Sequence, residues 1–182
     1  MHTLYNVAHL VYAEPFKAQV YLHMIETAVN QAIIQHERIT RGEVLLRKVR
    51  KPGAKMKRLM TTMFSDIHHY LICWAEVSKL YYRLREVQAI FGAVPANHVR
   101  DLAEHRDYRN HLEHIDERIE RGISDLGNLS GNKFTFDGKQ LDIGNSDLQK
   151  LMLFYEELIK IARSNFDQPF LNSFKLAERL NY

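Results

Sequence analysis

The chain has 182 residues, of which 46% are hydrophobic and 26% charged, and its formal net charge is +3. These proportions are ordinary for globular proteins and argue against wholesale disorder. The length suits one domain with a sizeable core and is short for two, so residues 1–182 are expected to form a single helical domain.

Cysteine content and the start of the chain indicate a compartment. Cys73 is the one cysteine, which excludes an intramolecular disulfide, and it lies in an apolar run where a buried thiol is expected. The first six residues lack the basic start and apolar core of a signal peptide. No apolar stretch approaches the roughly 20 residues that span a bilayer. We therefore expect a cytoplasmic protein with no membrane partner.

Two long helices are predicted in the first half of the chain. Apolar residues recur every three or four positions from about Pro15 to Glu37, and again from about Lys55 to Phe91. A basic connection broken at Pro52-Gly53 separates them. The second helix would be roughly 50 Å long, more than the width of a compact domain of this size. Such a helix either kinks or packs against something outside the chain, which suggests a homodimer.

The second half of the chain mixes helices with a hairpin. A third helix is predicted from Pro95 or Asn97 to about Leu126, followed by a loop over 127–131. The dipeptide Asp137-Gly138 between two apolar runs is a hairpin signal. A further helix, capped by Asn145 or Ser146, would run to about Arg163, and a short one would begin near Pro169. We expect an all-α antiparallel helical bundle with one small β-hairpin: a helical core over about 15–126, then the hairpin and C-terminal helices over 127–182.

The third helix is polar on more sides than packing requires. His105, Arg109 and Asp116 fall on or beside its apolar line. Buried polar groups need partners, so these residues are expected either to be paired or to face a cleft.

One motif in this helix resembles a known signature. Arg109, Asn110 and, after three further residues, His114 resemble the signature of the HEPN superfamily, an α-helical fold that includes metal-independent ribonucleases. The resemblance implies that Arg109 contacts phosphate, His114 acts as acid or base, and Asn110 orients them. It also implies that arginine and histidine of two protomers meet at a dimer interface. Arg106, Asp107 and His111 match the same signature in an overlapping register.

These residue types suit RNA cleavage without a metal or other cofactor. Histidine titrates near neutrality and can take the proton of the 2′-OH, while arginine presents a bidentate fork to phosphate. Because residues five apart on a helix diverge by about 140°, Arg109 and His114 do not easily converge within one subunit. Pairing across a two-fold axis would bring the two groups together.

A basic run offers an RNA contact. Between positions 41 and 58 there are eight cationic residues and one acid, Glu43. The candidate RNA-binding residues are Arg47, Lys48, Arg50, Lys51, Lys55, Lys57 and Arg58. The run is equally typical of a solvated connection between helices.

Other readings of the third helix remain open. Its arginines would pair with Asp116, Glu113 and Glu117 in an ordinary charged surface, as expected of a non-catalytic helical interaction protein with a polar homodimer interface. Alternatively, Asp107, His111 and His114 have a spacing that would allow a shared metal ion, although no second carboxylate–histidine helix is visible.

Overall fold

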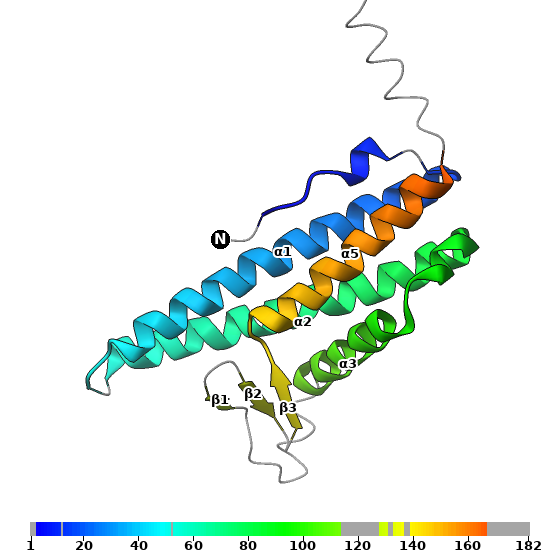
Figure 1. Cartoon of the computed structure of the whole chain (residues 1–182). Coiled ribbons are helices and arrows are strands. Elements are labelled where there is room, and N and C mark those ends of the chain that lie inside the picture. Colours follow the sequence, from blue (N-terminus) through cyan, green and yellow to red (C-terminus); the bar gives the residue numbers. More distant parts are fainter. Residues whose placement is uncertain are drawn as a thin grey trace, which may run out of the picture.

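The computed structural model describes residues 3–11, 13–51, 53–113, 128–130, 133–136 and 139–166 (Figure 1). Its helices are η1 (Ala8–Leu10), α1 (Phe16–Arg47), α2 (Ala54–Val87), η2 (Ala89–Ala93), α3 (Ala96–Glu113) and α5 (Asn145–Asn165), of which η1 and η2 are 3-10 helices. A small antiparallel sheet of three short strands lies beside them. The predicted all-α bundle with a small β-hairpin is thus confirmed.

Helices α1 and α2 form a long antiparallel hairpin (Figure 1). Helix α1 extends ten residues beyond the expected end at Glu37, because Ile39 remains buried and Arg38 forms an ion pair of 2.8 Å with the buried Asp66 of α2. Gly42 allows close approach of the two helices, since a Cβ there would lie 2.5 Å from Met63 Cγ. The connection between the helices is therefore short, and most of the predicted basic run lies on helix ends.

The end of α2 differs from the prediction. The helix stops at Val87 rather than Phe91, since Gln88 has an extended backbone and η2 follows. This break turns Phe91 into the core, where its carbonyl oxygen accepts a hydrogen bond of 3.0 Å from the Tyr81 hydroxyl. Because α1 has nearly the same length and packs along α2, the length of α2 is no argument for a second copy of the chain.

The N-terminal segment is held to the bundle by a buried carboxylate. Glu26 of α1 accepts hydrogen bonds from the backbone N–H groups of Val7 (2.7 Å) and Ala8 (2.8 Å) and from the Tyr155 hydroxyl of α5. Burial, the hydrogen bond and the nearby negative charge of Glu26 all raise the pKa of Tyr155. Asn30 exchanges two hydrogen bonds of 2.7 Å with the backbone of Tyr5. The segment before α1 is therefore part of the packed structure.

The sheet confirms the hairpin and adds a strand. Strands β2 (Lys133–Phe136) and β3 (Lys139–Asp142) pair antiparallel, and the predicted turn residues Asp137 and Gly138 between them lie outside the described residues. The expectation of a loop over 127–131 is wrong for β1 (Asn128–Ser130), which pairs with β2 and sets Leu129 opposite Phe134. Phe134 also meets Phe64 of α2 edge-on, with ring centroids 6.1 Å apart. The sheet thereby packs against the first half of α2.

Three further sequence predictions concern the state of Cys73, the helices beyond Glu113 and membrane-spanning segments. Cys73 is buried, and burial raises the pKa of its thiol to about 11, as expected of an inert cysteine. The part of the third helix beyond Glu113 and the helix predicted near Pro169 lie outside the described residues. Within the residues that the structure describes, no helix combines the length and the apolar character needed to cross a bilayer.

Candidate functional site

Helix α3 returns along α2 and is held there by a stacked ring pair. The imidazole of His105 lies flat on the indole of Trp74, with ring centroids 3.7 Å apart and an interplanar angle of 9°. Both side chains are buried. His105, which was predicted to interrupt the apolar stripe of the third helix, is therefore buried and packs on Trp74.

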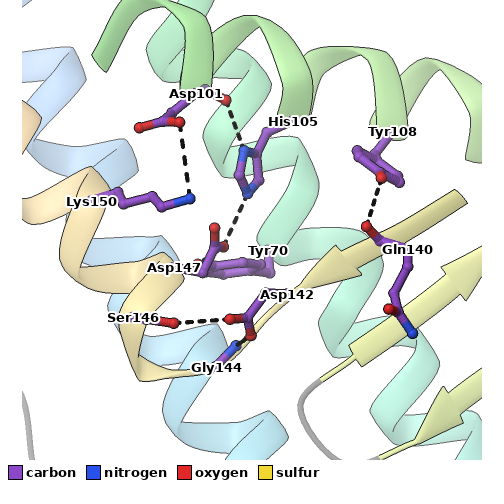
Figure 2. Close-up of polar contacts among 10 residues, drawn as sticks. All are labelled: Tyr70, Asp101, His105, Tyr108, Gln140, Asp142, Gly144, Ser146, Asp147 and Lys150. Atoms are coloured by element: carbon purple, nitrogen blue, oxygen red, sulfur yellow. Dashed lines mark hydrogen bonds and ion pairs between the residues drawn. The ribbon is translucent and has the colours of Figure 1, made fainter. Parts of the chain in front are cut away.

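The polar partners of His105 come from two directions (Figure 2). Its Nδ1 lies 2.8 Å from the carbonyl oxygen of Asp101, one turn earlier on α3, and its Nε2 lies 3.0 Å from Oδ2 of Asp147 on α5. A carbonyl oxygen only accepts, so Nδ1 carries a hydrogen. The contact between Nε2 and Asp147 joins two side chains that are both almost fully buried.

Asp147 also accepts a hydrogen bond of 2.9 Å from the Tyr70 hydroxyl of α2. Burial, aided by the negative charge of Asp147, raises the pKa of Tyr70 well above its ordinary value, so the hydroxyl stays a donor. Three helices, α2, α3 and α5, therefore meet at one carboxylate that is 2% exposed. We call Tyr70, Trp74, His105 and Asp147 the buried polar network.

The first turn of α5 is positioned by Asp142 rather than by the predicted caps. Asp142 at the end of β3 accepts hydrogen bonds from the backbone N–H of Gly144 (2.8 Å) and the hydroxyl of Ser146 (2.9 Å). Gly144, not Asn145 or Ser146, precedes the helix. This contact ties the sheet to the turn that carries Asp147 (Figure 2).

A second contact anchors α3 to the sheet. The Tyr108 hydroxyl donates a hydrogen bond of 2.9 Å to the carbonyl oxygen of Gln140 on β3. Lys150 of α5 also lies 3.9 Å from the Asp101 carboxylate. The part of α3 just before the motif is therefore fixed on two sides (Figure 2).

The motif residues follow immediately after these anchors. Arg109, one turn beyond His105, is half-buried, and its Nη1 lies 3.2 Å from Oδ1 of the exposed Asn110. His114 lies outside the described residues, so its position relative to Arg109 stays a prediction. In the alternative register, Arg106 and Asp107 are exposed, and the side chain of His111 is not described.

The predicted RNA-binding cations gather at one end of the α1–α2 hairpin. Arg47 ends α1, the others lie in the connection or on the first turns of α2, and all seven are exposed. We call the seven together the basic tip: Arg47, Lys48, Arg50, Lys51, Lys55, Lys57 and Arg58. None of them has a carboxylate within ion-pair distance in the described part of the chain. Burial raises the pKa of nearby Glu43, an effect that the charge of Arg47 opposes.

Metal ligands do not gather in the described structure. Over the ranges it covers, no three His, Cys, Asp or Glu side chains lie where they could share a metal ion. Asp107 is exposed on α3, the side chain of His111 is not described, and His114 lies outside the described residues.

Sequence reasoning missed the partners of His105. Asp147 is 42 residues from His105 along the chain, and Tyr70 is 77 residues from Asp147, so no helical spacing links the three residues. The one usable signal was the polar interruption of the stripe at His105.

Comparison with protein-family models, with curated proteins and with solved structures gives no match.

Proposed function

We propose that this protein is a metal-independent endoribonuclease of the HEPN type. In this proposal Arg109 contacts the scissile phosphate, His114 moves the proton of the 2′-OH as acid or base, and Asn110 orients them. Arg106, Asp107 and His111 form the alternative register. The proposal starts from the resemblance of the motif and rests on how α3 is held.

The observation that carries the proposal is the anchoring of α3 directly before the motif. His105 is fixed by Asp147 and Trp74, and Tyr108 is fixed by β3. Catalytic groups work best when supporting contacts hold them within a fraction of an ångström. A half-buried Arg109 beside two anchored residues has limited freedom and would present its guanidinium at a defined place.

A second copy of the chain completes the proposed site. On a helix, Arg109 and His114 point about 140° apart, so one subunit does not bring them together readily. We propose a homodimer in which Arg109 of one copy faces His114 of the other, as a two-fold axis would arrange them twice.

The basic tip supports an RNA substrate. Trp74 of α2 stacks on His105, which lies one turn before Arg109, and α3 runs antiparallel to α2 (Figure 1). Lys57 is 17 residues before Trp74 on α2, about 26 Å along the axis. Seven exposed cations at that distance would attract a phosphate backbone toward the motif.

A second candidate function is suggested by an exposed apolar stripe on α1. Phe16, Val20 and Met24 recur at four-residue intervals and are 75%, 39% and 42% exposed. Apolar stripes of this kind are typical of protein–protein contacts. A non-catalytic helical interaction protein would use such a face, with the polar motif at its dimer interface.

RNA cleavage in excess EDTA distinguishes these two functions. We expect purified protein to cut RNA under these conditions and to leave 2′,3′-cyclic phosphate ends, because the 2′-OH itself attacks the phosphate. The ends are identified by their resistance to 3′-labelling after phosphatase treatment alone, and by their labelling once acid has opened the cyclic phosphate and phosphatase has removed the resulting monoester. Absence of cleavage over a broad panel of RNAs would contradict the nuclease and leave the interaction protein.

A further inference from the structure

An open apolar groove lies within the basic tip. It has a volume of about 370 Å³ and is lined by residues from the start of α2: Gly53, Met56, Lys57, Met60, Thr61 and Phe64. Met60 is 41% exposed. Apolar side chains are thus presented to solvent in the most positively charged part of the described chain.

The cations near the groove favour a polyanionic ligand. Lys57 lines it, and Lys55 and Arg58 are exposed on the same turns of α2. These cations have no ion-pair partner among the described residues, so a phosphate chain would find unneutralised charge there. The complementary occupant carries negative charge along its length and an apolar group that fits the groove beside Lys57.

An unpaired nucleobase meets the second requirement. Bases have flat π-faces that stack on aromatic side chains, and the polarisable sulfur of methionine also makes favourable contacts with aromatic rings. Phe64 and the two methionines supply both kinds of surface. In a duplex the bases are stacked and paired, so a duplex cannot place one in a lateral groove.

We propose that this groove receives a base of single-stranded RNA while the basic tip holds the adjoining phosphates. The proposal rests on the proposed function in taking RNA as the polyanion, and it specifies single strands as the substrate class. A bilayer is the competing occupant that the test must separate, because a basic helix with an apolar face can also bind anionic lipid.

The test is a binding measurement that does not depend on cleavage. Fluorescence anisotropy compares a labelled single strand of about 12 nucleotides with the same strand in a duplex, within the site sizes of such proteins. The RNA carries 2′-O-methyl groups, so that no 2′-OH can attack. Met60→Ala removes a groove wall, and Ile34→Ala is its control, since Ile34 is 44% exposed on α1 outside the tip. Lys57→Gln is paired with Lys17→Gln, another exposed lysine.

We expect the single strand to bind more tightly than the duplex. Met60→Ala should weaken single-strand binding about five- to tenfold with an unchanged salt dependence, because it removes stacking and no charge. Lys57→Gln should reduce the slope of log affinity against log salt by about 0.7. Both control variants should bind like the wild type, and all variants should unfold at similar temperatures.

Two results would overturn the groove as a base site: a duplex that binds as tightly as the single strand, or Met60→Ala behaving like Ile34→Ala. Binding to anionic phosphatidylserine vesicles that is lost in Met60→Ala, with RNA binding unaffected, would assign the groove to a membrane surface and also overturn it. The nuclease fails separately: groove-dependent RNA binding without cleavage of unmodified RNA would support the groove and contradict the proposed function.

Discussion

Replacing Asp147 with alanine is expected to lower the free energy of unfolding by about 3–5 kcal/mol. Asp147 is the shared hydrogen-bond partner of His105 and Tyr70, and all three are at least 98% buried. Without it, His105 loses the partner of Nε2 and Tyr70 retains a buried hydroxyl with no acceptor, which water cannot easily replace. Urea unfolding followed by circular dichroism measures the loss.

A control variant and a variant that should restore stability test this prediction further. Asp107→Ala, at an exposed aspartate of α3, should change the free energy of unfolding by less than about 0.5 kcal/mol. The triple variant Tyr70→Phe, His105→Phe, Asp147→Leu should recover most of the loss, because it removes the three hydrogen-bonded side chains together and keeps a ring on Trp74. An Asp147→Ala protein as stable as Asp107→Ala would show that the buried polar network does not hold the three helices together.

Removing either proposed catalytic side chain is expected to abolish most RNA cleavage. Arg109→Ala deletes the charge that would stabilise the phosphate in the transition state, and the rate should fall about 10²- to 10³-fold. His114→Ala deletes the acid or base, and the rate should fall about 10²- to 10⁴-fold. Initial rates in EDTA on one RNA substrate measure both effects.

The control for these variants is Arg100→Ala, at an exposed arginine on the same helix, which should cleave at the wild-type rate. Loss of activity in Arg106→Ala and His111→Ala, with Arg109→Ala active, would assign the site to the alternative register. Cleavage that survives all of these substitutions would contradict an arginine–histidine site on α3.

Helical periodicity predicted the backbone of this fold well. Ile25, Val29 and Ile33 of α1 and Trp74 of α2 belong to the predicted apolar repeats of the first two helices, and they are buried as expected. The Asp137-Gly138 signal placed β2 and β3 correctly, since turn chemistry of this kind is local. Element ends were less predictable: the end of α1 depends on Arg38, Ile39 and Gly42 meeting a second helix.

The arrangement of polar side chains was predictable only in part. The stripe of the third helix indicated that His105 needed a partner, and the structure identifies Asp147. That pairing depends on the packing of α5 against α3, which no local spacing encodes. Strand β1 was missed for a similar reason, because three residues form a strand only when β2 lies beside them.

The most direct measurement of the central claim is the cleavage rate of a heterodimer that combines one Arg109→Ala copy with one His114→Ala copy. Co-expression with two different affinity tags isolates it from the homodimers. If Arg109 of one copy works with His114 of the other, one of the two sites keeps both groups and the other keeps neither. The heterodimer should then cleave RNA in EDTA at about half the wild-type rate, while both variant homodimers stay nearly inactive. A heterodimer as inactive as the homodimers would contradict a ribonuclease site shared between two copies of this chain.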